Sequence, residues 1–430
     1  MEEKKQNIGD EIELFTKHID SIGDVLISMI MVLQEISKKS KESLNKFEGE
    51  KCEVTESGSE REVKIPNEHY WKWNKLDRRY EHVELARELL PRSLLVSLVS
   101  QYDAYLGRVL RFIFLNKPEI LNGSERKISF EDLNQFTSIA EAREYILEKE
   151  IEAILRYSHG EQFKWMEKAF NLPLTKELKN WGRFIEITER RNLFVHTDGV
   201  VSSQYLTVCF QHKYKIDDSI KEGTRLAVPQ KYFESAYECI YEIGVKLGHV
   251  LWRKLYPDER SLADAALQRT TDELIDSGKY RLAYNLLDFA CEFKKFSSES
   301  NQLILTVNRA QAYKWAGEEE RCKEIMCAVD WSAKGNQFKL ADAVLARDWD
   351  RAAEVMKRIG HQGSVSKQDY REWPLFKEWR KEERFLAIYE EVFGESFAVK
   401  IGTKPHQEEL IVAESSDSKV TEETVIDEAL

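Results

Sequence analysis

Three observations predict an all-α protein built from a helical bundle and an α-hairpin repeat region. The chain holds only 19 Gly and 8 Pro in 430 residues, too few for the closely spaced turns of a β-sandwich or barrel. Apolar side chains recur every three to four residues over long stretches, which is the spacing that lines one face of a helix. Hydrophobic residues make up 42% of the chain, enough for packed cores and too many for a wholly disordered protein.

An amphipathic helix is predicted within residues 1–36. Its apolar side chains follow helical spacing, and they are Ile12, Phe15, Ile19, Ile22, Leu26, Met29, Ile30 and Leu33. This broad apolar face has to be buried, either on the helix's own domain or against a second subunit. The pattern is too short to decide between the two.

Residues 37–66 are rich in Lys, Ser, Glu and Gly and poor in apolar side chains. A segment of this kind cannot form a core, so we expect a mobile linker or a long loop. Order resumes at residue 67, and Trp71 and Trp73 follow closely. We interpret both tryptophans as packing anchors in preference to a base-stacking platform.

Residues 67–256 are predicted to form a bundle of amphipathic helices. The long apolar pattern of residues 85–115 contains Pro91, which we expect to break the pattern near a helix start. Helical periodicity returns in four further segments, residues 140–157, 161–170, 178–195 and 231–254. Gly199 is placed to cap the third of these helices.

Residues 257–360 carry a weak internal repeat. Turns are expected at Gly278, Gly317 and Arg347–Asp348. Small side chains follow these turns by five residues and would let paired helices approach closely: Ala283, Cys322 and Ala352. The pattern resembles a degenerate tetratricopeptide helical hairpin, which implies a concave face for a protein partner.

The C-terminal part holds a predicted helix pair over residues 361–402 and an acidic tail over residues 403–430. The tail has two Lys against eight acidic residues, and we expect it to be disordered. The chain's formal net charge of −12 argues against a protein that holds nucleic acid by overall charge. Because half of that charge lies in the tail, a local cationic RNA site remains compatible with the composition.

Neither a membrane span nor a secretory signal is predicted. The first residues lack the charged-then-apolar order of a signal, and the most apolar window, residues 22–36, is too short to cross a bilayer. The six cysteines are scattered without the C-x-x-C spacing of a zinc or redox site. We therefore expect reduced thiols in a cytoplasmic protein that has no membrane contact.

The segment with the most informative chemistry is residues 188–199, TERRNLFVHTDG. Thr188, Asn192 and His196 recur at i, i+4 and i+8, so they form a polar stripe on an otherwise apolar and aromatic helix. Arg191 lies one position from Asn192, near that stripe. A polar stripe on such a helix needs partners or a chemical role.

The run from Arg191 through Asn192 to His196 resembles the R-N-x3-H motif of the HEPN superfamily. The likeness covers roughly residues 67–256, because the long helix before the motif, the middle helices and the exit after the motif also look like HEPN domains. The resemblance implies a metal-independent endoribonuclease, in which two subunits pair and two motifs face one cleft. It also implies an RNA substrate, a homodimer through the bundle, no metal, no cofactor, and a toxin-like effector in prokaryotic antiviral defence against phage.

The residue types fit cleavage of RNA through its own 2′-hydroxyl. His196 is the expected general base or acid, because only His titrates near neutral pH without perturbation. Arg191 is the expected phosphate clamp, since a guanidinium binds two oxygens at once and keeps its charge. Asn192 would orient the phosphate or the imidazole. Expected in support are Arg190, which adds positive charge, Asp103, a polar partner from the preceding long helix, and Thr188.

A structural interpretation of the same residues stays open. His196 near a helix end can interact with the last carbonyls and the helix dipole, and an Arg–Asn pair can act as a buried brace. The chain would then be a non-catalytic protein-binding scaffold or a regulatory subunit. One departure bears on regulation: HEPN toxins paired with nucleotidyltransferase antitoxins tend to carry a Tyr two residues after the His, where this chain has Asp198.

Overall fold

The computed structural model describes residues 7–57, 60–123, 134–176 and 178–397, together with Ser129 and Glu131. Within these ranges the regular structure is helical apart from one sheet of two strands, so the predicted all-α fold is confirmed. None of the helices in these ranges combines the length and hydrophobicity needed to cross a membrane. The acidic tail predicted over residues 403–430 lies outside the described residues.

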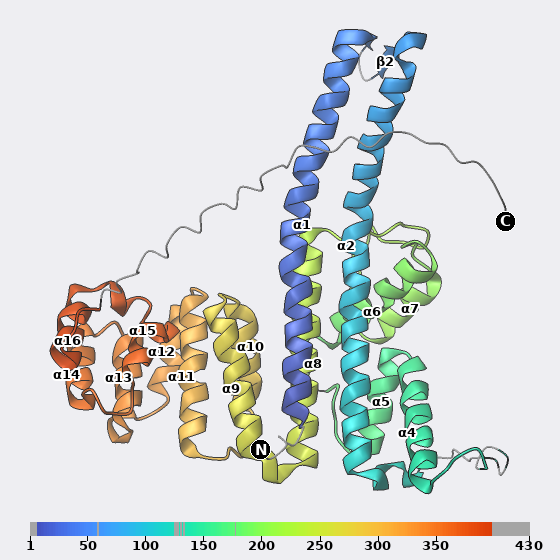
Figure 1. Ribbon diagram of the computed structural model, residues 1–430. Coiled ribbons are helices and arrows are strands. Elements are labelled where there is room, and N and C mark those ends of the chain that lie inside the picture. Colours follow the sequence, from blue (N-terminus) through green and yellow to red (C-terminus); the bar gives the residue numbers. More distant parts are fainter. Residues whose placement is uncertain are drawn as a thin grey trace, which may run out of the picture.

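Figure 1 shows a long helical arm, a bundle below it and a row of shorter helices beside the bundle. The elements of the arm and bundle are α1 (Ile8–Lys51), β1 (Glu53–Ser57), β2 (Glu60–Lys64), α2 (Asn67–Asn116), a 3-10 helix (Pro118–Gly123), α4 (Ile139–Arg156), α5 (His159–Phe170), α6 (Trp181–His196), α7 (Ser203–Gln211) and α8 (Gln230–Leu255). The row beside them holds α9 (Arg260–Asp276), α10 (Tyr280–Cys291), α11 (Glu299–Trp315), α12 (Glu319–Cys327), α13 (Asn336–Leu345), α14 (Trp349–Ile359), α15 (Lys367–Glu372) and α16 (Glu383–Phe393). Short 3-10 helices lie at Pro257–Glu259, Trp331–Ala333, Pro374–Phe376 and Trp379–Lys381.

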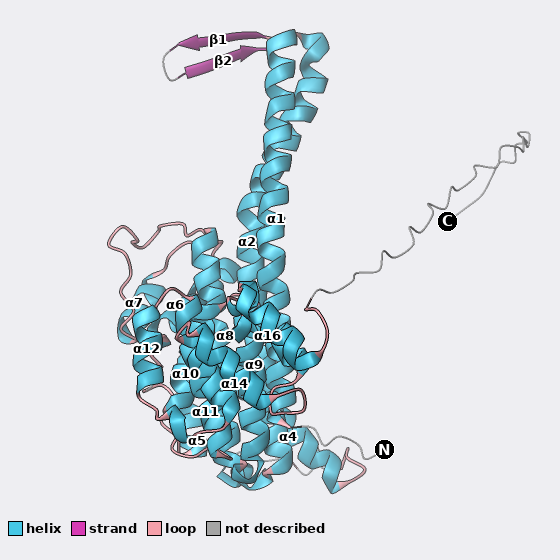
Figure 2. Cartoon of the chain, turned by 90° about the vertical axis from the view of Figure 1, so that its left-hand side faces the viewer, coloured by secondary structure: helices cyan, strands magenta, loops and turns pink. Residues whose placement is uncertain are grey.

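α1 and α2 are long antiparallel helices whose distal halves project from the bundle (Figure 1). We call residues 28–51 of α1 and residues 67–90 of α2, with the β1–β2 hairpin, the arm. The hairpin leaves the tip of the arm sideways (Figure 2), and its antiparallel register pairs Val54 with Val63. The arm ends where Pro91, the first buried residue of α2, enters the bundle.

The prediction of a mobile linker or long loop over residues 37–66 is wrong. α1 continues to Lys51, and the hairpin occupies most of the remaining residues. The buried seam of α1 in the arm is made by side chains three to four residues apart, among them Ser37, Ser40, Leu44 and Phe47. A seam this narrow is enough to pair two helices, and the rest of the segment stays polar. The composition of the segment therefore did not reveal the helix.

The predicted helix break at Pro91 is also wrong. α2 runs from Asn67 to Asn116 with Pro91 inside it. Proline has no N–H to donate to the carbonyl of Arg87, a loss that costs about 3 kcal/mol in a helix interior. The buried residues of α2 begin at Pro91, and their packing in the core of the bundle offsets the loss.

The first half of α1 buries its apolar face within the chain itself, which is one of the two predicted alternatives. Phe15 stacks on Tyr105 of α2, with ring centroids 4.4 Å apart. α8 approaches this pair closely because it carries glycines there: a Cβ on Gly244 would lie 2.3 Å from the Phe15 ring, and one on Gly248 would lie 2.2 Å from the Tyr105 hydroxyl. α1, α2 and α8 therefore form the centre of the bundle.

The predicted domain boundary after residue 256 does not divide the core. One continuous hydrophobic core runs from α1 through the bundle into α9 and α10, and it includes Leu305 and Ala312 of α11. A second core starts on the other face of α11, with Leu303 and Val307, and continues to α16. The hairpin row is thus fused to the bundle, and α11 is shared by both cores.

Other predicted elements are confirmed. α4, α5, α6 and α8 match the four predicted bundle helices to within about three residues at each end, and α15 and α16 lie where the C-terminal pair is predicted. The turns of the hairpins α9–α10, α11–α12 and α13–α14 lie at Gly278, Gly317 and Arg347, with φ of 77°, 89° and 57°. The same hydrogen bond closes each turn, from the N–H of the following residue to the carbonyl five residues back, over 2.8, 2.9 and 2.9 Å.

The buried His249 of α8 predicts a specific pH dependence of stability. The imidazole is fully buried, neither ring nitrogen has a hydrogen-bond partner among the described residues, and burial lowers its pKa to about 3. The unfolded chain, with a His pKa near 6.5, binds this proton first as the pH falls, so stability is lost below about pH 6.5. We expect His249→Leu to remove about 2 kcal/mol of the stability loss that the wild type shows between pH 7 and pH 5 in urea unfolding.

The exposed His361 supplies the control for this experiment. His361→Ala should keep the pH dependence of the wild type. Equal pH dependence in the wild type and His249→Leu would show that His249 does not contribute.

Candidate active site at the end of helix α6

α6 is buried along its middle and emerges at its C-terminal end. It packs against α2 and α8. Thr188 is fully buried, and its hydroxyl donates to the carbonyl of Ile185 at 2.9 Å. Asn192, one turn later, is half-buried, and His196 is exposed as the last residue of the helix. The expected polar stripe thus begins in the core, and Thr188 does not face a ligand.

Arg191 is anchored by a carboxylate on α2. Its Nη2 donates to Oδ2 of Asp103 at 2.7 Å, while Oδ1 of Asp103 lies 2.8 Å from Nε2 of His159, the first residue of α5. The His159 side chain is buried, and those of Arg191 and Asp103 are 20% and 26% exposed. The expected contact between Asp103 and the motif is therefore present, and one carboxylate joins three helices.

Only one of the three guanidinium nitrogens of Arg191 forms a hydrogen bond with the described residues. Nη2 is used by Asp103, Nε is buried without a hydrogen-bond partner, and Nη1 forms no hydrogen bond with the described residues. Glu189 lies beside this group, and burial raises the pKa of its carboxyl against the opposing effect of His159, Asn192 and Arg191. The Asn192 amide is 3.5 Å from the Glu189 carboxylate, too long for a strong hydrogen bond. Asn192 is therefore not locked in place by a protein partner.

The structure does not join His196 to Arg191 within one chain. Five residues separate them on α6, which corresponds to a rise of about 7.5 Å and a rotation of about 140°. The two side chains consequently leave the helix on different flanks. The His196 side chain is exposed, and its imidazole forms no hydrogen bond or ion pair with the described part of the chain.

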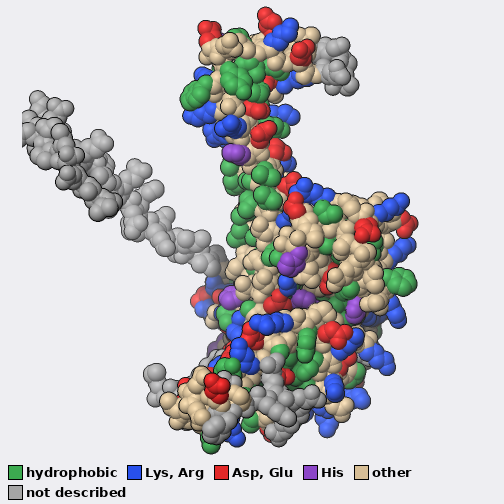
Figure 3. All heavy atoms as spheres, turned by 90° about the vertical axis from the view of Figure 1, so that its right-hand side faces the viewer, with side chains coloured by type: hydrophobic (Ala, Val, Ile, Leu, Met, Phe, Trp, Pro, Cys, Tyr) green, Lys and Arg blue, Asp and Glu red, His purple; other side chains and the backbone are tan. Residues whose placement is uncertain are grey.

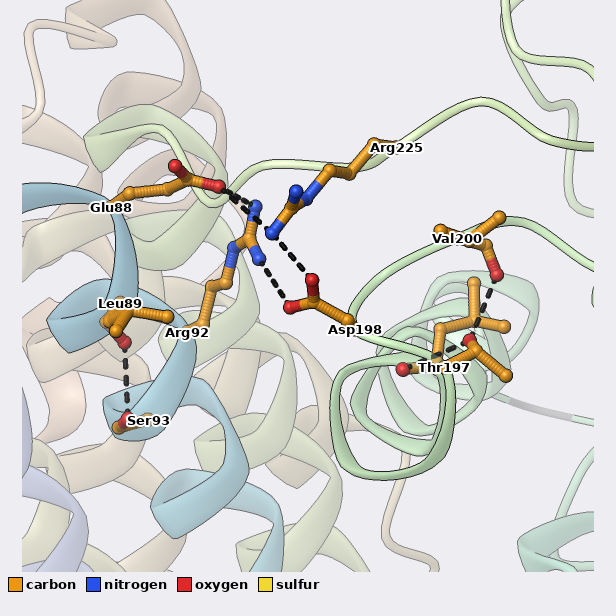
Figure 4. Close-up of polar contacts among 9 residues, drawn as sticks. Glu88, Leu89, Arg92, Ser93, Thr197, Asp198, Val200 and Arg225 are labelled. Carbon is orange, nitrogen blue, oxygen red and sulfur yellow. Dashed lines mark hydrogen bonds and ion pairs between the residues drawn. The ribbon is translucent and has the colours of Figure 1, made fainter. Parts of the chain in front are cut away.

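The chain leaves α6 through an ion-paired turn (Figure 4). Asp198 and Gly199 have positive φ angles of 52° and 80°, and the N–H of Gly199 donates to the carbonyl of Leu193 at 3.0 Å, as the predicted cap requires. The Asp198 carboxylate accepts from Arg92 of α2 at 3.2 Å and from Arg225 at 2.6 Å. Asp198, two residues after His196, is thus a structural carboxylate.

Glu88 of α2 completes this ionic group (Figure 4). It pairs with Arg92, and its Oε1 lies 3.6 Å from Nη2 of Arg225. Two carboxylates and two guanidinium groups balance in charge at the junction between the arm and α6. They fix the end of α6, where His196 lies, against α2.

The expected role of Arg190 in binding RNA is corrected by its burial. Its Nε donates to Glu186 at 2.7 Å, its Nη1 donates to the carbonyl of Ala227 at 3.1 Å, and its guanidinium lies 3.9 Å from the centre of the Tyr232 ring. Burial alone would lower its pKa, but Tyr232 and Glu186 outweigh burial and raise it. These contacts make Arg190 a brace between α6 and α8. Its neighbour Arg191 faces α2 instead, because successive residues of a helix point about 100° apart.

His159 is the member of the site that sequence reasoning missed. No regular spacing connects it with the motif, since it lies 56 residues from Asp103 in the sequence. The one local signal is Ser158, whose side chain caps α5 and so places His159 in the first turn of that helix. Only the packing of α5 on α2 and α6 shows which way the imidazole faces.

The site has no metal-binding cluster in the described ranges, in which no group of three or more His, Cys, Asp or Glu side chains could hold a metal ion. No protein-family model, curated protein or solved structure matches the chain. The resemblance to HEPN proteins therefore rests on the motif and on its place in the helical bundle.

The shared carboxylate predicts a measurable stability effect. Asp103→Ala leaves the partly buried Arg191 and the buried His159 without their partner, and we expect the free energy of unfolding to fall by about 1–3 kcal/mol. Urea unfolding at pH 7 measures the difference. The control is Glu144→Ala, which removes an exposed ion pair with Arg111 and should cost less than about 1 kcal/mol. Equal losses in the two variants would contradict the anchoring role of Asp103.

Proposed function

We propose that the chain is a metal-independent endoribonuclease of the HEPN type. The observation that carries the proposal is the pairing, on one helix, of an anchored guanidinium with a free nitrogen and an exposed imidazole, Arg191 and His196. The place of the motif at the end of a helix in an all-α bundle supports it. The motif resemblance further supports a cytoplasmic, toxin-like effector in prokaryotic antiviral defence against phage.

The proposed reaction uses the 2′-hydroxyl of the RNA as its nucleophile. One His196 takes the proton of that hydroxyl, and the 2′-oxygen attacks the neighbouring phosphorus. The bond to the 5′-oxygen breaks, the leaving oxygen takes a proton from an imidazolium, and a 2′,3′-cyclic phosphate and a 5′-hydroxyl end remain. Nη1 of Arg191 binds the phosphate oxygens as negative charge gathers on them. Asn192, which is not locked in place, orients the phosphate or the imidazole.

A homodimer supplies the geometry that one chain lacks. Arg191 and His196 leave α6 on different flanks, so a twofold axis near the end of α6 would bring Arg191 of one copy toward His196 of the other. Exposed apolar side chains flank the imidazole: Val195 is 51% exposed and Val200 is 38% exposed. An interface between two copies would cover them.

A protein-binding scaffold is the second candidate, and a groove in the hairpin row favours it. The cavity, of about 850 Å³, lies among α9, α11, α13 and α15, and its apolar wall includes Phe338 and Trp373. Five carboxylates and no Lys or Arg line it: Asp272, Glu273, Asp276, Asp369 and Glu372. Burial raises the pKa of Asp272 to about 7. The charge of this groove suits a basic segment of a protein partner.

The leading proposal predicts RNA cleavage in the presence of EDTA. We expect His196→Ala and Arg191→Ala each to lower the cleavage rate about 10²- to 10⁴-fold, because they remove the proton-transfer group and the phosphate clamp. Denaturing gels of a labelled RNA and identification of the new ends measure the rate and the chemistry. His361→Ala, at an exposed His far along the chain, is the matched control and should cut like the wild type.

Cutting by both variants at the wild-type rate would show that the assigned chemistry is wrong. If the wild type cuts no RNA while pull-downs recover a stable partner, the scaffold function is supported instead.

The dimer proposal predicts that Val195→Glu disrupts both assembly and cleavage. A charge placed at the proposed interface disfavours its burial, so the mass in solution should shift from dimer to monomer. Light scattering at several concentrations measures this mass. Phe210→Glu on α7 changes an even more exposed apolar residue, 82% exposed, and should leave the dimer intact. A wild-type protein that is monomeric at micromolar concentration would overturn the proposal.

A further inference from the structure

The two tryptophans near the tip of the arm have different environments. Trp73 packs toward α1, and its Nε1 donates to the buried carboxylate of Glu48 at 2.9 Å. Trp71 is 74% exposed, so its predicted role as a packing anchor is wrong. A large aromatic ring left in water on the surface of a long helix calls for a partner or a function.

Cationic side chains surround the exposed ring. Trp71 lines a shallow groove of about 450 Å³ together with Asn74, Lys75, Arg78, Arg79, His82 and Val83. Lys75 Nζ lies 5.5 Å from the centre of the Trp71 indole. Because these residues are three to four apart, they share one face of α2. We call this set the arm strip.

The charge of the arm strip is not neutralised by the protein. In the described ranges no ion pair is formed by Lys75, Arg78 or Arg79, although most arginines elsewhere in this acidic chain pair with a carboxylate. The acids on this stretch of α2 are Asp77 and Glu81. Asp77 is half-buried, burial followed by Glu81 and Glu48 raises the pKa of its carboxyl, and in the described ranges it forms no ion pair with Lys75, Arg78 or Arg79.

The arm strip is connected to the candidate site by a single helix. α2 carries Arg79 in the strip, Arg92 at the junction with α6, and Asp103 beside Arg191. At 1.5 Å per residue, Arg79 is about 20 Å from Arg92 and about 36 Å from Asp103 along the axis. Figure 3 shows Lys, Arg and His side chains on the upper arm, with Asp and Glu side chains beside them, above a band of hydrophobic side chains and the bundle.

We propose that the arm strip binds single-stranded RNA and guides it toward the end of α6. The Trp71 ring stacks on an unpaired base, and Lys75, Arg78 and Arg79 contact successive phosphates. A paired base would not be open to the ring, which is why the strip fits a single strand better than a duplex. The inference rests on the proposed ribonuclease function and deepens it by naming the form of the substrate and the surface that recognises it.

Binding is tested in the full chain with His196→Ala, so that the RNA is not cut. Fluorescence anisotropy with a labelled, unstructured 20-nucleotide RNA gives the Kd. We expect Trp71→Ala to weaken binding about 10-fold and Trp71→Phe to restore most of it, because a phenyl ring still stacks. Arg78→Glu with Arg79→Glu should weaken binding by at least 10-fold. It should also lower the slope of log K against log salt by about 1.4, the value for two phosphate contacts on a single strand.

The matched control is Lys294→Glu with Lys295→Glu, which makes the same change in net charge at two exposed, adjacent lysines after α10. This control should bind RNA like the parent protein. Circular dichroism should show unchanged helix content in all variants, since every changed side chain on the arm is exposed.

The outcomes separate this inference from the proposed function. Unchanged RNA binding in the arm variants overturns the inference, and so does an equal loss of binding to duplex RNA or to anionic lipid vesicles. In the background with His196 intact, the arm variants should raise KM for a single-stranded RNA at least 10-fold with little change in kcat. If the wild type binds single-stranded RNA through the arm strip but cuts no RNA, the binding proposal is supported and the endoribonuclease proposal is rejected.

Discussion

The Asp103 carboxylate is the contact on which the geometry of the candidate site depends. It binds Arg191 of α6 and His159 of α5 from its place on α2, so three helices meet at one partly buried negative charge. Removing charges from water is costly, and an ion pair of this kind is kept more for the orientation it imposes than for net stability. The orientation here is specific, because Nη2 of Arg191 is held by Asp103 while Nη1 forms no hydrogen bond with the described residues.

The second constraint is the continuity of α2. Its 50 residues carry the arm strip, the ionic junction with Asp198 and the anchor for Arg191. A break at Pro91 would separate the arm from the bundle, whereas the continuous helix sets the spacing between them. α1 and α8 pack on α2 within the bundle, and Gly244 and Gly248 permit the close approach of α8.

Much of the fold could be predicted from the sequence, because helices and their turns depend on neighbours within about four residues. The bundle helices and the three hairpin turns are examples. The failures share one cause. The polar second half of α1, the passage of α2 through Pro91 and the core that crosses residue 256 all depend on a partner helix distant in the sequence, and no local pattern records that partner.

The sequence by itself determined the candidate residues, since an Arg and a His five positions apart, Arg191 and His196, can be recognised from residue type and spacing alone. Only the tertiary structure decided what each of them faces. Arg190 and Arg191 are adjacent and identical, yet one is a buried brace on Glu186 and the other is held by Asp103 with a nitrogen to spare. Trp71 and Trp73 differ in the same way, because Trp71 is exposed to water and Trp73 donates a hydrogen bond to Glu48. The physical reason is that a side chain's environment is set by which elements pack around its helix, and that packing brings together residues far apart in the chain.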